Sequence, residues 1–370
     1  MMPQKIESEA RRWRTLLKPL ARRLNRSDRG TQAAEKERPR VMYIARNFPQ
    51  ISQTYIRSEI EALQADYEIS VISVSEANVP YKRCVPFRKI ADPAMIREAI
   101  EEFRPHLLHS HYLNQSEILA ALIDQGWLNT PFTIRAHSFD TLARDSEMAR
   151  RAAAVINHDL CFGILSFPFT RPLLENAGIR GEKILDCYPV VNYPRFHDRS
   201  PNGGAVMNVG AAIPKKRMED FIDLACQFPG TEFNLYAVGH MVDQLALYNE
   251  SKGNAVRIMP PIEPDEMPAE YKKHRWLVYT ASREIGTVGW PMAIAEAQAA
   301  GLGICIPNLR PDLREYIGAA GFIYESISEV ADIIRRPVPD EMREIGFEQA
   351  RKSNIFEHKT ILTDLWQRGL

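Results

Sequence analysis

Short apolar runs rich in β-branched residues alternate with stretches of helical periodicity along the chain, in two successive halves. Before residue 192, we expect strands at 41–45, 69–74, 106–111, 132–136 and 161–166. After residue 204, we expect them at 205–210, 233–239, 255–259, 276–280 and 303–306. An apolar run of this length can also be buried helix, but the β-branched content favours strand. Strands separated by helices form βαβ units and parallel sheets, which predicts an α/β chain with two Rossmann-like, doubly wound domains.

A polar, turn-rich stretch, Asn192–Gly204, separates the two halves and is typical of an interdomain linker. At 370 residues the chain is also long for a single core. We expect a basic tail over 1–39, an N-terminal domain over 40–193, a linker over 194–204, a C-terminal domain over 205–345, and a C-terminal helix over 346–370 that returns to the N-terminal domain. Two facing domains would close a cleft around one ligand, because each binds ligands at the carboxyl ends of its strands.

The charge and cysteine content exclude several classes of protein. The 47 basic and 47 acidic residues balance, so no net field attracts the chain to nucleic acid. The five cysteines are scattered without a close pair or a His/Cys cluster, which argues against a disulfide framework or a structural zinc site. No apolar run has the length of a membrane span or the form of a signal peptide. We therefore expect a cytoplasmic protein, either soluble or resting on the inner face of a membrane.

The first candidate site follows the first strand of the second half. Gly210 ends that strand, and Lys215, Lys216 and Arg217 open the helix expected after it. Backbone amides at a helix N-terminus, with cations beside them, suit a diphosphate. The alternative is a solvated basic first turn, although the helix dipole disfavours basic residues there.

The second candidate is Glu296, in a loop and helix over Thr287–Gly301. Pro291 is placed to start the helix and Gly301 to end it, and alternating alanines make the helix thin enough to pack close to a sheet. Glu296 is the only charged residue in this apolar helix. Its carboxylate either meets solvent or accepts hydrogen bonds from a ligand such as ribose.

Histidines at the strand ends of the first half form the third candidate. His137 can donate to a sugar hydroxyl or to charge that develops at a reacting carbon, and a packed or capping histidine is an equal alternative. His109 and His111 have a spacing that can hold a metal. Because no matching carboxylate or thiol pattern accompanies them, we predict no metal site.

Five segments together resemble glycosyltransferase family 4, the retaining enzymes of the GT-B fold, in its exopolysaccharide branch. They are Phe48–Leu63 (FPQISQTYIRSEIEAL), His109–Tyr112 (HSHY), Pro131–Asp140 (PFTIRAHSFD), Val209–Lys216 (VGAAIPKK) and Gly289–Gly301 (GWPMAIAEAQAAG). Each motif is moderately specific, and their order and spacing strengthen the resemblance. It covers about residues 40–370.

The resemblance implies a metal-independent transfer, without a cofactor, of a hexose from a nucleotide diphosphate sugar to a glycan or lipid-linked acceptor in polysaccharide or glycolipid biosynthesis. By it, Lys216 would neutralise the diphosphate, Glu296 would hold the ribose, and His137 would lie at the reaction centre. The donor would meet Gly210, Lys215, Lys216, Arg217, Glu284, Val288, Gly289 and Glu296. The acceptor side would include Ser52, Thr54, His111 and Asp140.

Two positions depart from the family pattern. Ala211 stands where the family has an arginine, and Val288 stands where it has the first of two glutamates. An arginine lost from a diphosphate site removes a charge-assisted hydrogen bond. Either the donor is unusual, neighbours such as Lys215, Arg217 or Glu284 substitute, or activity is lost. The alternatives to a transferase are a nucleotide-sugar epimerase on the same fold and a catalytically silent GT-B partner in an assembly complex.

The tail generates a testable prediction. Residues 1–40 contain three Lys and nine Arg against four Glu and one Asp, and residues 7–26 place apolar residues at helical spacing among the basic ones. Such a helix can lie on an anionic membrane, whereas a solvated tail is the alternative. We expect the full chain to float with anionic vesicles and a chain that starts at Arg38 to remain behind. Equal flotation of the two would exclude the tail as an anchor.

Overall fold

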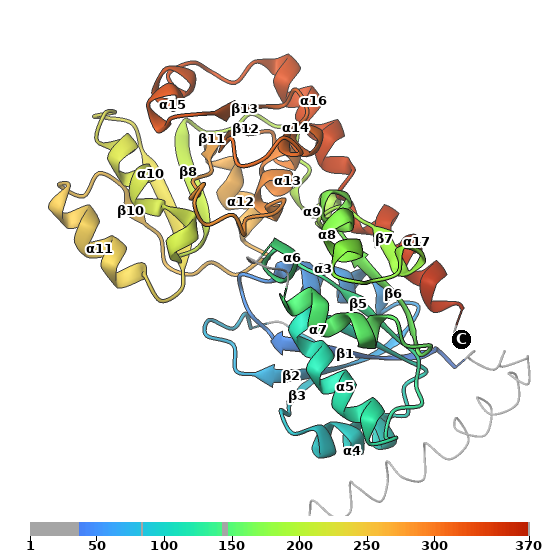
Figure 1. Ribbon diagram of the computed structural model, residues 1–370. Coiled ribbons are helices and arrows are strands. Elements are labelled where there is room, and N and C mark those ends of the chain that lie inside the picture. The colour runs from blue at the N-terminus through green and yellow to red at the C-terminus, as the bar shows by residue number, and fades with distance from the viewer. Residues whose placement is uncertain (1–36, 83, 143–146, 369–370) are drawn as a thin grey trace, which may run out of the picture. The chain divides into compact units, whose positions relative to one another are not determined.

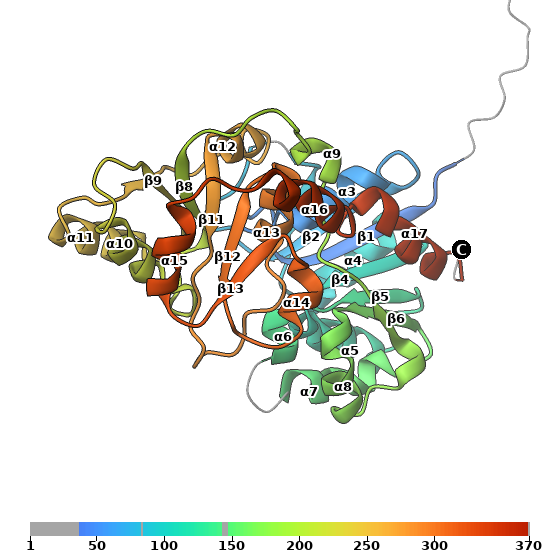
Figure 2. The same cartoon turned by 90° about the horizontal axis from the view of Figure 1, so that it is seen from above.

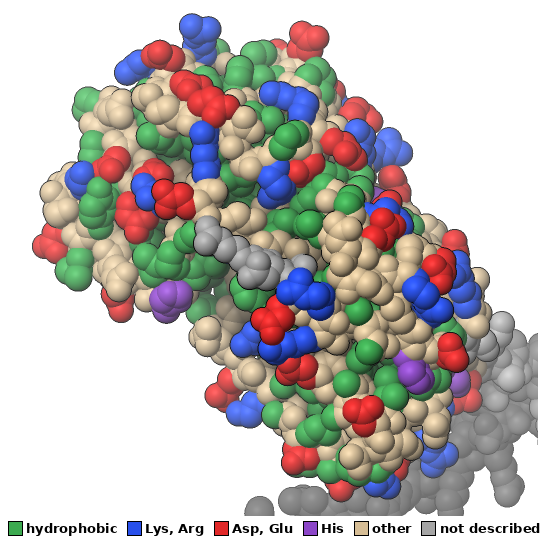
Figure 3. Space-filling view, in the orientation of Figure 1, with side chains coloured by type: hydrophobic (Ala, Val, Ile, Leu, Met, Phe, Trp, Pro, Cys, Tyr) green, Lys and Arg blue, Asp and Glu red, His purple; other side chains and the backbone are tan. Residues whose placement is uncertain are grey.

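The computed structural model describes residues 37–82, 84–142 and 147–368, and residues 39–370 belong to one compact unit (Figure 1). The basic stretch expected over residues 7–26 lies outside the described residues. Within the described part, no helix is both long and apolar enough to cross a membrane. On the face drawn in Figure 3, acidic and basic side chains are interspersed.

The first half forms a seven-stranded parallel sheet in the order β3-β2-β1-β4-β5-β6-β7. The strands are β1 (Arg40–Asn47), β2 (Glu68–Ser75), β3 (Phe87–Lys89), β4 (Leu107–His111), β5 (Phe132–Arg135), β6 (Cys161–Ser166) and β7 (Ile184–Asp186). The helices are α3 (Thr54–Leu63), α4 (Pro93–Phe103), α5 (Ser116–Asp124), α6 (Ser138–Leu142), α7 (Glu147–Ile156) and α8 (Arg171–Asn176).

Side-chain alternation along the central strand β1 builds a core on each face of this sheet. Met42 and Ile44 join the core cluster that contains α4, α5 and α7. Val41 and Tyr43 point the other way, into a cluster with residues of α3 and with Trp366. Every residue of the central strand β4 is buried, including its polar residues His109, Ser110 and His111.

The second half forms a six-stranded parallel sheet in the order β10-β9-β8-β11-β12-β13. The strands are β8 (Ala205–Ala211), β9 (Phe233–Val238), β10 (Arg257–Ile258), β11 (His274–Val278), β12 (Gly303–Pro307) and β13 (Gly321–Tyr324). The helices are α10 (Met218–Ala225), α11 (Val242–Ser251), α12 (Met267–Lys272), α13 (Met292–Ala299), α14 (Leu313–Ile317) and α15 (Ile327–Ile334). Residues of α13 and α14 pack in the core on one face, and those of α10 and α15 on the other.

Two segments join the halves. The short helix α9 (Tyr193–Phe196) starts the connection after β7, and Asn192 caps it by accepting from the Arg195 amide. At the C-terminus, α16 (Asp340–Arg351) lies beside α13 (Figure 2). The chain then turns at Asn354, whose side chain accepts from the Phe356 amide, and α17 (Ile355–Trp366) packs against the N-terminal sheet through Leu362, Leu365 and Trp366.

The predicted α/β class with two doubly wound sheets is confirmed. Every strand expected from the sequence is present, although β11 begins two residues earlier than expected and β10 is reduced to Arg257–Ile258. The strands β3, β7 and β13 were not predicted. Each is an edge strand of three or four residues, and all of β3 is exposed, so no apolar run marks it in the sequence.

Candidate functional site

A cavity of about 490 Å³ lies where strands of both sheets reach their carboxyl ends. Tyr112 and His137 line it after β4 and β5, and Gly210 and Ala211 line it at the end of β8. Among the described residues in its wall, the basic side chains are Arg57, Arg135, Arg195, Lys215 and Lys216, whereas Glu296 is the single carboxylate. The three arginines pair with carboxylates outside the lining, so Lys215 and Lys216 are the described cations of the wall that remain for an anionic ligand.

Lys215 and Lys216 occupy a 3-10 turn over Pro214–Lys216, and α10 begins only at Met218. The sequence predicted that the basic residues would open the helix; they precede it, because Arg217 has a left-handed backbone with φ of 46°. The Arg217 guanidinium is exposed and pairs with Asp220 at 2.8 Å, outside the cavity wall. The predicted donor-binding role of Arg217 is therefore not supported by its position.

The two lysines are held in the wall by neighbouring loops. The Lys216 ammonium contacts the hydroxyl of Tyr279 and lies 4.3 Å from the centre of its ring. The Lys215 ammonium donates to the carbonyl of Thr287 at 3.2 Å. Burial lowers the pKa of Lys216 to about 7 and also lowers the pKa of Lys215. An anion bound in the cavity would favour the ammonium forms and so offset the cost of their desolvation.

Glu296 projects from α13 into the cavity wall and is half-buried. Its carboxylate accepts from the Tyr271 hydroxyl at 2.7 Å, and burial raises its pKa to about 7. One oxygen is thus held by the protein, and the carboxylate keeps further acceptor capacity for a ligand.

The loop before α13 places Val288 and Gly289 in the wall and leaves Glu284 outside it. Arg310 fixes this arrangement: its guanidinium donates to the carbonyl of Val288 and pairs with Asp312 at 2.8 Å. Asp312 also accepts from the Trp290 indole at 2.7 Å. Glu284 is exposed, so the expectation that it replaces the missing carboxylate is not supported by its position. Sequence reasoning missed Arg310 and Asp312, although two opposite charges directly after a predicted strand were a usable signal.

His137 lines the cavity with its ring packed against two tyrosines. The ring centres of Tyr55 and Tyr112 lie 4.5 and 4.2 Å from that of His137. Burial, and then the neighbouring His111, holds the pKa of His137 well below its usual range, so the ring is neutral. The Asp140 carboxylate accepts from the backbone amides of His137 and Leu113, each at 3.0 Å, which fixes the turn after β5.

The predicted acceptor-side residues divide into two groups. Ser52 and Thr54 line the cavity at the start of α3. Asp140 and His111 are buried and lie outside the lining, so neither can contact a ligand directly. His111 lies behind His137, with 3.2 Å between its Nδ1 and Nε2 of His137.

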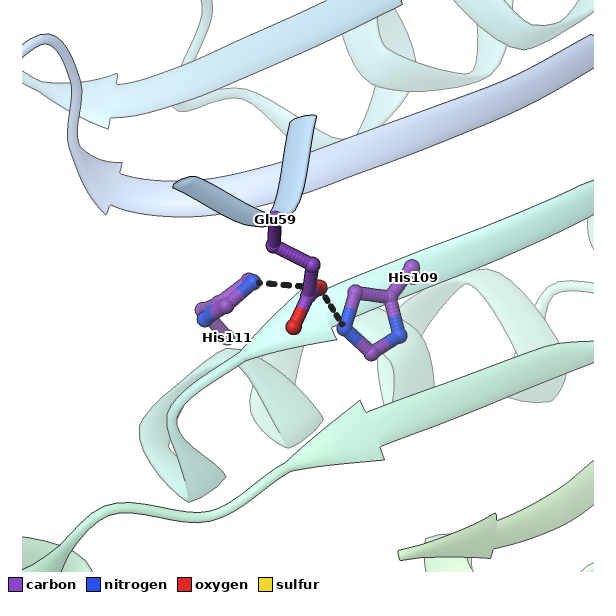
Figure 4. A group of neighbouring side chains, drawn as sticks. All are labelled: Glu59, His109 and His111. Atoms are coloured by element: carbon purple, nitrogen blue, oxygen red, sulfur yellow. Dashed lines mark ion pairs between the residues drawn. The ribbon is translucent and has the colours of Figure 1, made fainter. Parts of the chain in front are cut away.

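A buried group, here termed the Glu59 cluster, consists of Glu59, His109 and His111 (Figure 4). Glu59 Oε1 lies 3.0 Å from Nε2 of His109 and 3.4 Å from Nε2 of His111. Glu59 is the carboxylate that the sequence did not associate with the two histidines, because it comes from α3. The three ligand atoms lie close enough together to hold a metal ion.

The charges around the Glu59 cluster favour an ion pair over a metal site, and Nε2 of His109 and of His111 makes no hydrogen bond within the described residues. Arg135 Nη2 lies 2.7 Å from the other oxygen of Glu59, and this guanidinium holds the pKa of Glu59 well below its usual range. Arginine and glutamate already neutralise each other. A divalent cation would add two charges to a fully buried region in which no further described carboxylate balances them.

The chain matches no protein-family model and no curated protein sequence. Its fold is similar to that of sucrose-phosphate synthase from Thermosynechococcus elongatus, with a TM-score of 0.67 and 14% identity over 90% of this chain and 100% of that one. Anabaena HepE in complex with UDP and glucose gives a TM-score of 0.63 and 15% identity over 88% and 97%. The apo form of the lipopolysaccharide outer core galactosyltransferase WaaB gives 0.58 and 13% over 88% and 99%.

The fold is GT-B. These structural neighbours are GT-B glycosyltransferases, and identities this low establish the fold alone. The GT-B architecture expected from the sequence is thereby confirmed. In this chain, the cavity lies between the two sheets that define the fold.

Gly289 generates a prediction about how the cavity wall is assembled. A Cβ on Gly289 would lie 2.4 Å from Cβ of Ser138, so this position admits only glycine while the loop contacts the turn after β5. We expect Gly289→Ala to lower the free energy of unfolding by about 1–3 kcal/mol, as overpacking does, in urea denaturation. Gly286→Ala, in the same loop with nothing within 4 Å, should be near neutral.

A double mutant tests the named contact. Ser138→Gly removes the Cβ that an alanine at 289 would meet, so the cost of Gly289→Ala should be smaller in that background than in the wild type. Equal costs in the two backgrounds would show that the strain arises elsewhere.

Proposed function

We propose that this chain is a retaining glycosyltransferase that moves a hexose from a nucleotide diphosphate sugar to a glycan or lipid-linked acceptor in polysaccharide or glycolipid assembly. The observation that carries the proposal is the combination of Lys215, Lys216 and Glu296 in one cavity at the strand ends of a GT-B fold. The lysines are suited to a diphosphate, and the carboxylate is suited to ribose hydroxyls. The structural neighbour HepE was solved with UDP and with UDP-glucose, which makes uridine nucleotides the first ligands to test.

The diphosphate would approach the turn after β8. Gly210 lines the cavity with φ of 153°, and an added Cβ there would face the end of the Lys216 side chain at 3.8 Å. Glycine therefore leaves room for an anion beside the Lys216 ammonium. Ala211 supplies no guanidinium here, so Lys215 is the cation that accompanies Lys216 in this part of the wall.

The sugar would lie between His137 and Val288. Val288 is buried, and Arg310 holds its backbone, so the side chain presents an apolar surface that no neighbouring carboxylate replaces. A sugar hydroxyl without a partner costs about 1–3 kcal/mol. We infer that the donor sugar places an apolar edge on Val288, as a deoxy or otherwise modified hexose would.

The proposed mechanism is electrostatic and needs no metal. Lys216 stabilises the leaving diphosphate, and the acceptor attacks from the face that the leaving group vacates, so the anomeric configuration is retained. A lipid-linked acceptor would be reached at a membrane surface, where we propose that residues 7–26 attach the chain.

A panel of UDP, GDP, TDP and ADP sugars, including deoxyhexoses, tests this function with glycan and lipid acceptors. The expected result is acceptor-dependent release of nucleotide diphosphate and a product with the anomeric configuration of the donor. Ala211 and Val288 favour one alternative, a catalytically silent binding partner. Tight nucleotide-sugar binding without turnover over the whole panel would support that alternative.

Substitutions in the cavity should separate donor-binding residues from their neighbours. We expect Lys216→Met and Glu296→Gln each to weaken nucleotide-sugar binding at least tenfold in calorimetry. Methionine cannot donate to the diphosphate, and glutamine lacks the charge and the second acceptor oxygen, whereas a hydrogen bond to a charged group is worth about 1.5–3 kcal/mol. Arg217→Ala and Glu284→Ala are matched controls of similar charge outside the wall, and both should bind normally. A loss in the controls as large as in the cavity variants would move the donor site elsewhere.

Proton uptake gives a pH-dependent prediction. With a pKa of about 7, Lys216 is mostly neutral at pH 8, and a bound diphosphate favours its ammonium form. Binding of the donor at pH 8 should therefore take up about one proton, and affinity should fall as pH rises above 7. Glu296, with a pKa of about 7, is mostly ionised at pH 8 and adds little.

Calorimetry in two buffers of different ionisation enthalpy measures this uptake. It should disappear in Lys216→Met, and it should persist in Arg217→Ala. Uptake of the same size in Lys216→Met would assign the proton to another group.

A further inference from the structure

A line of buried side chains connects the cavity to an ion pair inside the N-terminal sheet. His137 in the cavity wall contacts His111, His111 contacts Glu59, and Glu59 pairs with Arg135. Glu59, His109 and His111 have no exposed surface. Sequence analysis placed His111 on the acceptor side, but its burial excludes direct contact with a ligand.

The proton positions follow from the inner end of the line. The Arg135 guanidinium lies 2.7 Å from Glu59, so the glutamate is a carboxylate. His111 Nε2 lies 3.4 Å from Oε1 of that carboxylate. This contact does not meet hydrogen-bond geometry, but a nitrogen lone pair this close to a carboxylate oxygen would be repelled by it, whereas an N–H would be attracted. In a neutral His111, Nε2 therefore carries the proton and Nδ1 is the acceptor.

The proton position of His111 in turn sets that of His137. His111 Nδ1 lies 3.2 Å from His137 Nε2, and since the former accepts, the latter must donate. In a neutral ring the remaining nitrogen, Nδ1 of His137, then has a lone pair. No hydrogen bond joins this nitrogen to another described residue.

We propose that Glu59 and His111 are positioning residues that fix His137 in its Nε2–H tautomer, so that His137 offers a hydrogen-bond acceptor to a ligand in the cavity. The rings of Tyr55 and Tyr112 pack against the His137 ring and restrict its rotation. The ligand group that this recognises is a hydroxyl, which donates to Nδ1. His137 would thus accept a hydrogen bond from the ligand, whereas the sequence suggested that it donates one.

A metal ion in the Glu59 cluster would impose the opposite arrangement. The ion would bind the lone pair of His111 Nε2, the proton of His111 would move to Nδ1, and His137 Nε2 would become the acceptor. His137 would then carry its proton on Nδ1. A measurement of the His111 and His137 tautomers therefore distinguishes a metal-free cluster from one that holds a metal ion. This measurement does not depend on the proposed function.

The experiment is long-range ¹H–¹⁵N correlation spectroscopy on the full chain labelled with ¹⁵N-histidine, with the signals of His137 and His111 identified by their loss in His137→Phe and His111→Phe. The expected result is Nε2 protonated and Nδ1 unprotonated in both residues. A protonated Nδ1 on His137 overturns the proposal. So does elemental analysis that finds one metal ion per chain in protein purified without chelator.

A matched pair of variants tests the positioning role. His111→Phe and His109→Phe each remove one buried ring beside Glu59, but only His111 contacts His137. We expect the His137 signals to move toward tautomer-averaged positions in His111→Phe and to stay unchanged in His109→Phe, at similar loss of thermal stability. An unchanged tautomer in His111→Phe overturns the role of His111, and wild-type spectra still test the tautomer if a variant does not fold.

The kinetic consequence rests on the proposed function. If the hydrogen bond to Nδ1 tightens in the transition state, His111→Phe should lower kcat roughly tenfold with the donor KM within about twofold. His109→Phe should keep both values near those of the wild type. A wild-type chain with the expected tautomer and no turnover would reject the proposed function alone, whereas normal turnover in His111→Phe would reject the kinetic role of the tautomer.

Discussion

The ion pair between Arg135 and Glu59 is the interaction on which the organisation of the N-terminal half depends. Glu59 is fully buried on α3, and its carboxylate meets Arg135 from β5, His109 and His111 from β4, and the Tyr43 hydroxyl from β1 at 3.1 Å. Removing one partner of such a pair leaves an uncompensated buried charge, which costs about 3–5 kcal/mol. The pair therefore fixes α3 against the three central strands, and it fixes the strand ends that carry His137 into the cavity.

The C-terminal half supplies the opposite kind of electrostatics. Neither Lys215 nor Lys216 forms a salt bridge with a described carboxylate, and burial lowers the pKa of each. Glu296 has a pKa raised to about 7 by burial. Each of these groups has one neutral protein partner, which offsets only part of its desolvation, so a ligand that supplies opposite charge or further hydrogen bonds can offset more of the cost. The two halves thus differ in role: one holds a neutral histidine rigidly, and the other keeps charged groups available to an anion.

The departures from the family pattern gain a physical context from the loop around Val288. Arg310 and Asp312 hold the backbone of that loop and the Trp290 indole, so the apolar side chain at 288 is an ordered part of the wall. This arrangement is consistent with the proposed change of donor sugar and offers no substitute carboxylate at Glu284, which lies on the exposed side of the same loop.

The sequence by itself determined the features that depend on local periodicity and turn chemistry. Apolar runs marked the central strands, and Gly301 with φ of 81° ends the thin helix that carries Glu296, as its position after the alanines predicted. The placement of Lys216 and His137 just beyond the ends of strands also followed from the pattern, since parallel sheets gather their strand ends at one edge. Only the tertiary structure decided which side chains meet. Glu59 joins His109 and His111 across 50 residues, Arg217 and Glu284 turn away from the cavity, and His111 lies behind His137. Periodicity fixes the face of an element on which a residue lies, whereas the partner of a buried charge is set by packing between elements far apart in the chain.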